Sequence, residues 1–152
     1  MVIDAHYHPA FIKEVCGNEE LAKRRRNDMA YYKTGVAEVK RIKERMRSSG
    51  VDRCFLLPHD YSTVSGDRIS NEEMKDLVEL GEGMFYGFAS VDPNQEDAGE
   101  KLEYAFRELN LSGLKLHPSK QGFYPNDKKM YGLYEICVKH NKPILFHAGF
   151  TW

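Results

Sequence analysis

With 152 residues, 41% of them hydrophobic and 30% charged, the chain has the composition of a soluble globular protein and the length of one ordinary domain. Its formal net charge of −1 provides no general attraction to nucleic acid or to an anionic membrane surface, so neither partner is expected. Apolar runs such as CFLLP and PILF are far shorter than a membrane span, and Met1 leads directly into VIDAH without a signal-peptide pattern, so we expect a cytoplasmic protein.

Five short apolar runs predict β-strands at residues 2–7, 51–57, 84–91, 111–116 and 143–147. Each gap between them holds a segment with apolar residues three to four apart, as on the buried face of a helix: 36–50, 70–83, 97–110 and 126–141. Ser70 and Glu73 add a capping-box spacing to the second of these helices. Strict alternation of strands and helices favours parallel strands joined by right-handed crossovers.

The first connection, residues 9–35, is much longer than an ordinary loop between a strand and a helix. It includes ELAKRRRNDMAYY, which predicts a helix of its own. A loop at this place in a barrel is suited to cover a substrate, and Arg24, Arg25 and Arg26 offer guanidinium groups for a substrate carboxylate. The alternative is a solvated, charged helix face.

Parallel α/β proteins form either open doubly wound sheets or closed (βα)8 barrels. An open dinucleotide-binding sheet has a glycine-rich turn after its first strand, whereas here HYHPAF follows. We therefore predict one α/β domain over residues 1–152, a partial TIM (βα)8-type barrel of about five parallel strands alternating with helices. A complete barrel has eight strands over about 250 residues, so this chain corresponds to the N-terminal part.

Histidines stand at the ends of the predicted strands. Alternation places Asp4, His6 and His8 on one face of the first strand. Imidazoles two residues apart on a strand have Cα atoms about 6.5–7 Å apart, so both can reach one metal ion at about 2.0–2.1 Å. His117 and His147 end the fourth and fifth strands, and His147 is placed to meet His6 and His8 across the barrel axis. An ordinary hydrogen-bonded histidine is the alternative for His117.

The segments MVIDAHYHP, GLKLHPSKQGFYPND and KPILFHAG, in this order, resemble the amidohydrolase superfamily. The resemblance is to the amidohydrolase-related group that includes aromatic-acid decarboxylases, an oxalomesaconate hydratase and lactonases. It implies a (βα)8 barrel in which His6, His8 and His147 bind one divalent metal, zinc or alternatively manganese. Asp4, Lys115 and His117 would then contact the substrate or orient the metal ligands.

Part of the family pattern is not found in this sequence. Members also place a histidine after strand six and an aspartate after strand eight, and with neither strand present no catalytic residue is assigned. Other branches carry a metal-bridging carboxylated lysine at the end of strand four. Lys115 lies in that strand, but the group that this chain resembles generally uses one metal without such a lysine.

The resemblance implies a metal-dependent hydrolase or lyase, similar to a decarboxylase or hydratase. It would act on a small carboxylate-bearing or cyclic substrate through a metal-activated water or a metal-polarised oxygen. Two alternatives are a degenerate half-barrel that binds metal or a partner without catalysis, and another HxH metallohydrolase such as a phosphoesterase barrel. Because a half-barrel exposes strand edges and one side of its core, we expect a homo-oligomer or a complementing chain.

Overall fold

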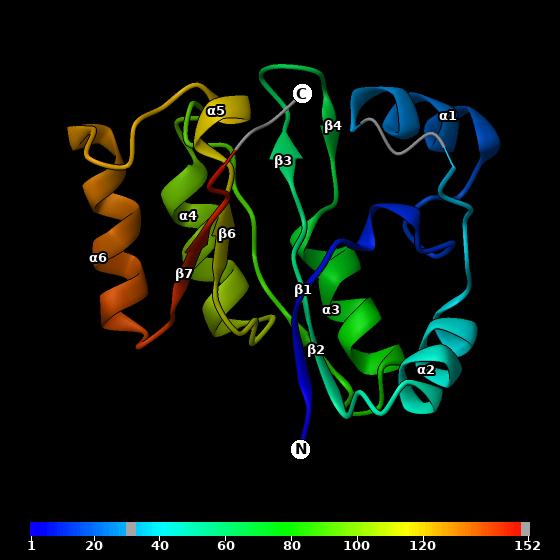
Figure 1. The fold of residues 1–152 in the computed structure, drawn as a ribbon. Helices are drawn as coiled ribbons and strands as arrows, with labels where there is room; N and C mark the ends of the chain where they lie inside the picture. Colours follow the sequence, from blue (N-terminus) through cyan, green and yellow to red (C-terminus); the bar gives the residue numbers. More distant parts are fainter. Residues whose placement is uncertain (30–32, 150–152) are drawn as a thin grey trace.

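The computed structural model describes residues 1–29 and 33–149 of the chain. Five short parallel strands follow one another in it: β1 Ile3–Tyr7, β2 Arg53–Leu56, β5 Phe85–Gly87, β6 Leu114–Leu116 and β7 Ile144–Phe146 (Figure 1). β2 pairs with both β1 and β5, and β6 pairs with β7. A parallel bridge between Ala89 and Leu114 joins the two groups, so the five strands are arranged in chain order, as in the wall of a barrel.

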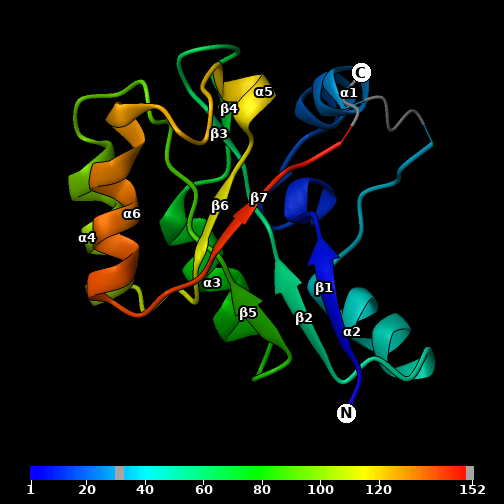
Figure 2. The same cartoon turned by 60° about the vertical axis from the view of Figure 1, so that its left-hand side comes forward.

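Each gap between successive parallel strands holds a helix of nine or ten residues that directly precedes the next parallel strand: α2 Val39–Ser48, α3 Asn71–Leu80, α4 Ala98–Arg107 and α6 Tyr131–Lys139. Figure 2 shows α4 and α6 packed beside each other next to β6 and β7. In α3, Ser70 Oγ accepts from the Glu73 N–H at 3.1 Å while the Glu73 carboxylate accepts from the Ser70 N–H at 2.7 Å. This reciprocal capping satisfies two backbone donors at the start of the helix, as the sequence spacing predicted.

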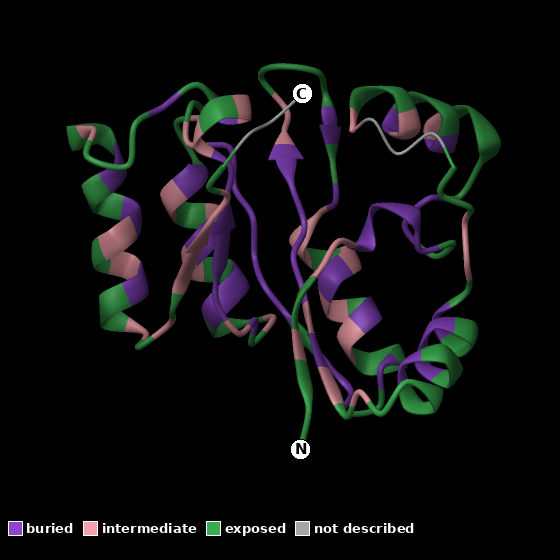
Figure 3. Cartoon of the chain, in the orientation of Figure 1, coloured by how far each residue is buried: buried purple, intermediate pink, exposed green. Residues whose placement is uncertain are grey.

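The hydrophobic core lies between the strands and these helices, where the buried positions gather in Figure 3. Each of these four helices contributes buried apolar residues to it. Among the parallel strands, β2, β5 and β6 contribute buried apolar residues, whereas Ile3 of β1 is 42% exposed and β7 is only partly buried. Representative core residues are Met46, Leu56, Met74, Leu102, Leu114 and Leu133. The predicted fold class and alternation of elements are confirmed, although each strand is shorter than its apolar run.

The first connection is ordered over most of its described length. It contains a 3-10 turn, η1 Pro9–Phe11, and helix α1 Glu19–Asp28, which begins where Asn18 Oδ1 accepts from the Leu21 N–H at 2.8 Å. The last part of the predicted helix, residues 30–32, lies outside the described residues. Figure 1 shows α1 at the end of the molecule to which β1 points, so this connection covers the C-terminal ends of the strands.

Several short elements were not predicted. β3 Asp60–Tyr61 and β4 Asp67–Arg68 form an antiparallel hairpin after β2, α5 Pro118–Gln121 follows β6, and η2 Lys128–Met130 precedes α6. Strands of two residues are too short to show an alternating pattern. The hairpin and α5 also lie at the C-terminal ends of the parallel strands (Figure 1). Within the described ranges, no helix combines the length and the apolar character needed to cross a membrane.

Candidate active site

Histidines and one lysine gather at the C-terminal ends of β1, β6 and β7. His6 lies near the end of β1 and His8 just after it, Lys115 lies in β6, and His117 and His147 follow β6 and β7 directly. The His147 N–H donates to the Leu116 carbonyl oxygen at 2.9 Å, which keeps the ends of β6 and β7 level with each other. The structure therefore brings the predicted residues to the end of the strands at which barrel enzymes place their chemistry.

His6 and His8 turn their Nε2 atoms towards each other. These two atoms are 3.0 Å apart, and His8 Nδ1 lies 3.1 Å from the carbonyl oxygen of Leu57. A carbonyl oxygen only accepts hydrogen bonds, so His8 Nδ1 carries the proton and His8 Nε2 presents a lone pair. Burial, with repulsion from His6, lowers the pKa of His8 to about 4, so this imidazole is neutral at physiological pH.

His117 and His147 stack face to face, with ring centroids 4.0 Å apart and ring planes 6° apart. His117 Nδ1 also accepts from the Lys120 N–H at 3.4 Å and thereby caps α5. His147 Nε2 is buried, and it has no hydrogen-bond partner among the residues described. Burial and the neighbouring His147 lower the pKa of His117 to about 3.

Lys115 is 2% exposed, and its Nζ has no hydrogen-bond partner within the described part of the chain. Burial lowers its pKa to about 8. Burial and then the Lys115 charge also lower the pKa of both His6 and His147.

Asp4 contacts the backbone near the site. Its Oδ1 accepts from the His6 N–H at 3.0 Å, so it holds the His6 main chain, whereas an orienting contact to an imidazole was one of the expected roles. The pairing of β1 with β2 is irregular between Asp4 and Tyr7, which interrupts simple alternation along this strand.

The His6–His8 pair has the geometry of two ligands of one metal. Two nitrogens that each lie about 2.1 Å from a metal, at angles between 90° and 109°, are about 3.0–3.4 Å apart. The observed Nε2–Nε2 distance of 3.0 Å falls at the short end of this range. Residues 1–29 and 33–149 contain no group of three or more His, Cys, Asp or Glu side chains already arranged to hold a metal. His147 Nε2, expected as the third ligand, is buried without a hydrogen-bond partner among these residues, but it does not complete such a group with His6 and His8.

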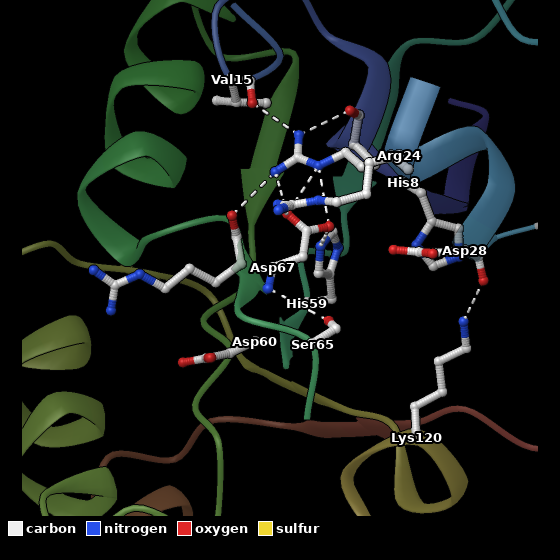
Figure 4. A network of polar contacts seen from close by, with 12 residues as sticks. His8, Val15, Arg24, Asp28, His59, Asp60, Ser65, Asp67 and Lys120 are labelled. Carbon is white, nitrogen blue, oxygen red and sulfur yellow. Dashed lines mark hydrogen bonds and ion pairs between the residues drawn. The ribbon is translucent and has the colours of Figure 1, made fainter. Parts of the chain in front are cut away.

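A buried ionic network that was not predicted lies beside this cluster (Figure 4). Arg25, only 1% exposed, donates from Nη2 to Asp67 Oδ1 at 3.0 Å and from Nε to both Asp67 carboxylate oxygens. The remaining N–H groups donate to three backbone carbonyls, those of Ala10, Val15 and Arg68. Because all donors of Arg25 are used inside the chain, both predicted roles for this residue, a clamp for a substrate carboxylate and a solvated charge, are wrong.

The other two arginines of the run differ from Arg25. Arg24 is half exposed and reaches Asp67 Oδ1 at 3.4 Å, while Arg26 pairs with Glu19 at 2.7 Å on the surface. The three arginines differ only in the contacts that they make in the folded chain. The sequence run 24–26 contains no signal that indicates which of them is buried. Arg24 therefore retains part of its hydrogen-bonding capacity at the edge of the site.

His59 connects the ionic network to the histidine cluster. Its Nε2 lies 2.8 Å from Asp67 Oδ2, and its ring stacks on Tyr61 with centroids 4.8 Å apart. Tyr61 in turn meets the His117 ring edge-on at 5.9 Å. The pKa of Asp67 stays below its ordinary range because hydrogen bonds from His59 and Arg25 outweigh the effect of burial. His59 stands three residues after Leu56, the last residue of β2, and its position after an apolar run is a signal available in the sequence.

A cavity of about 380 Å³ opens between α1, the β3–β4 hairpin and α5. Tyr61, Asp67 and Lys120 are among the residues that line it. Lys120 Nζ lies 5.8 Å from the centre of the Tyr61 ring and donates to the Asp28 carbonyl oxygen at 2.8 Å. The volume is sufficient for a small organic molecule.

The ends of the strands are fixed to one another by Gln121, which is buried in α5. Gln121 Oε1 accepts from the His117 N–H at 2.8 Å, and Nε2 donates to the carbonyls of Asp60 and Val91, each at 2.9 Å. One side chain therefore connects the segments that follow β2, β5 and β6. This bracing holds the His117 backbone in place without using its imidazole.

The amidohydrolase family model matches residues 3–152. The chain belongs to the amidohydrolase family. This membership confirms the resemblance found in the sequence and favours it over the phosphoesterase alternative. No curated protein matches this amidohydrolase chain.

Solved structures match its fold. An uncharacterised TIM-barrel protein from Bordetella bronchiseptica is 16% identical with a TM-score of 0.73, and the match covers 98% of this chain and 56% of that one. A 5-carboxyvanillate decarboxylase from Novosphingobium aromaticivorans, solved with manganese and 4-hydroxy-3-methoxy-5-nitrobenzoic acid, is 18% identical with a TM-score of 0.65 (99% and 51% covered). The corresponding decarboxylase from Sphingomonas paucimobilis is 17% identical with a TM-score of 0.67 (96% and 51%). The amidohydrolase chain thus spans about half the length of these TIM barrels.

Proposed function

We propose that this chain supplies the first metal ligands of a metal-dependent hydrolase or lyase. The observation that carries the proposal is the His6–His8 pair, whose Nε2 atoms converge to 3.0 Å while the Leu57 carbonyl fixes the tautomer of His8. His6, His8 and His147 would hold one divalent metal, zinc or alternatively manganese. When bound, such an ion polarises a substrate oxygen or lowers the pKa of a water towards about 7.

The surrounding residues prepare the histidines for this role. Burial lowers the pKa of His6, His8 and His147, which favours the neutral imidazoles that metals bind. The contact between Asp4 Oδ1 and the His6 N–H holds the backbone at His6, the first of the proposed ligands. The Leu57 carbonyl is the partner that orients a ligand imidazole, a role that backbone carbonyls often serve in metal sites.

The residues around the His6–His8 pair fit a small carboxylate-bearing or cyclic substrate. Loss of a carboxyl group from the substrate is one form that the reaction would take. The charges of Lys115 and Lys120 contribute, after burial, to the lowered pKa of His147. His6 and His8 line a cavity of about 880 Å³, and the separate cavity of about 380 Å³ is lined by Tyr61 and Lys120 among others. The two decarboxylases of similar fold, one of them solved with manganese and a nitrobenzoic acid, support this choice of substrate class and of the alternative metal.

Metal analysis of purified protein tests the ligand assignment. After loading with zinc or manganese and removal of free metal, we expect about one equivalent on the unmodified chain and a large loss in His6→Ala and His8→Ala. His140→Ala is the matched control, because His140 pairs with Glu103 at 2.6 Å, away from the site. Unchanged metal content in His6→Ala and His8→Ala would show that these residues are not ligands.

A degenerate barrel that binds metal without turnover is the second candidate. It is favoured by one observation, that the described residues hold no group of three metal-binding side chains already in place. The two candidates differ in a simple measurement. A metal-loaded chain that releases carbon dioxide from an aromatic acid supports the enzyme, and one that binds metal but is inactive towards a panel of aromatic acids and lactones supports the degenerate barrel.

A further inference from the structure

Lys115 is a buried cation without a counter-charge. Its residue is 2% exposed, and its Nζ has no hydrogen-bond partner in the described part of the chain. Burial is what lowers its pKa, to about 8, and no carboxylate of the described residues counteracts this effect. At neutral pH the amine is still mostly protonated, so a positive charge lies inside the site.

The groups around this ammonium are imidazoles. In the register of β6 with β7, Lys115 pairs with Leu145, so His117 and His147 each stand two residues further along these strands. The Lys115 charge also contributes, after burial, to the lowered pKa of His6, His8, His117 and His147. Neutral imidazoles do not compensate a cation as a carboxylate does. An unpaired buried ammonium destabilises a fold, and such groups occur mainly where a ligand completes them.

We propose that Lys115 is the anchor for a carboxylate group of a small ligand bound beside His6 and His147. This proposal deepens the proposed function, because it names the residue that would bind the carboxylate of the substrate. It rests on the proposed function in one respect only, namely that the bound carboxylate belongs to a substrate. A carboxylate satisfies both the charge and the N–H donors of Lys115.

His6 is the exposed member of the cluster, so the proposal places the entry of a ligand on its side. The lysine side chain is flexible, so its ammonium can turn towards an anion that enters beside this ring. The carboxylate would then lie next to the Nε2 pair of His6 and His8, close to the proposed metal. Lys120, whose Nζ already donates to the Asp28 carbonyl oxygen at 2.8 Å, is the less available cation of the two.

Benzoate is a suitable probe because it joins one carboxylate to a six-membered ring, and benzamide is its uncharged counterpart. Binding is measured by calorimetry and by NMR of the lysine Cε resonances, with metal-free and zinc-loaded protein. We expect benzoate but not benzamide to bind, and Lys115→Met to weaken benzoate binding at least tenfold. Lys142→Met, a change at a lysine beside the distant Phe106 ring, should remain within twofold.

The fold of Lys115→Met is checked by thermal unfolding, which should show equal or higher stability because an unpaired buried charge is removed. On the unmodified protein, saturating benzoate should raise the pKa of Lys115, an effect that needs no variant. Equal affinity of Lys115→Met, or an unchanged Lys115 resonance at saturation, would overturn the proposal. A carbamate signal on Lys115 after addition of 13C-labelled bicarbonate would also overturn the proposal, because the carboxylated lysine side chain would then be an anion and could not bind a carboxylate.

His8→Ala distinguishes this inference from the proposed function. This variant should lose the metal but still bind benzoate in its metal-free form, since Lys115 is unaltered. If the unmodified chain binds benzoate through Lys115 but takes up no metal, the proposed function fails and the carboxylate site stands. If it binds metal but no benzoate in either form, the carboxylate site fails and the metal assignment stands.

Discussion

Asp67 balances the charge of Arg25 inside the protein, so replacing Asp67 with Asn should be among the most damaging single changes in this chain. The substitution keeps the shape and one amide oxygen but leaves the guanidinium, 1% exposed, without a carboxylate. Removing one partner of a buried pair generally costs about 3–5 kcal/mol. We expect about 3 kcal/mol here, because the carbonyls of Ala10, Val15 and Arg68 still accept from Arg25.

Urea unfolding followed by circular dichroism measures this cost. With a slope of about 1.5 kcal/mol per molar urea, a loss of 3 kcal/mol lowers the midpoint by about 2 M. The double variant Arg25→Met/Asp67→Asn should lose less than the sum of the single changes by about 1.5 kcal/mol or more, because no unpaired charge remains. Arg26→Met is the control, since its partner Glu19 is 77% exposed, and it should shift the urea midpoint far less than Asp67→Asn does.

Two results would refute the reasoning about this network. One is an Asp67→Asn variant within about 0.5 kcal/mol of the unmodified protein, the range of ordinary surface changes. The other is strict additivity of the two single changes, which would mean that Arg25 and Asp67 do not stabilise each other.

Two further predictions concern pH and assembly. His8 has a pKa of about 4 in the folded chain against an ordinary value of 6.5, so protonation of His8 favours the unfolded chain. The free energy of unfolding of the metal-free protein should therefore be highest above pH 6.5 and fall as the pH falls towards 4, by about 2 kcal/mol at pH 5. Urea unfolding at each pH measures this loss. No loss between pH 8 and 5 would contradict a neutral His8. We also expect a dimer or larger assembly in light scattering, because β1 and β7 each pair on one side only among the described strands. A monodisperse monomer that unfolds cooperatively would contradict this expectation.

The regular elements were predictable because their signals are local. Apolar residues spaced as in SNEEMKDLVEL define one helix face whatever surrounds them, and the Ser70–Glu73 spacing marks where the helix begins. The approach of His6 to His8 follows from their spacing of two residues, although His8 lies just beyond β1 and the strand pairing is irregular between Asp4 and Tyr7. These inferences need no knowledge of distant parts of the chain.

Other features depend on packing between distant segments. The sequence does not indicate that Arg25, rather than Arg24 or Arg26, reaches a carboxylate 42 residues away. The hairpin that carries Asp67 consists of two-residue strands, too short for any periodic signal. His147 illustrates the same limit: its strand-end position was predictable, but its stacking on His117 depends on side-chain rotamers.

The pairing of each barrel strand with its predecessor has a consequence for how the protein is made. As the chain leaves the ribosome, β1 and β2 can associate first and each later strand can add to the existing edge. His6 and His8 are then placed in the earliest unit, whereas His147 arrives with the last described strand. Under the proposed ligand assignment, metal affinity should therefore rise only once β7 has docked on β6.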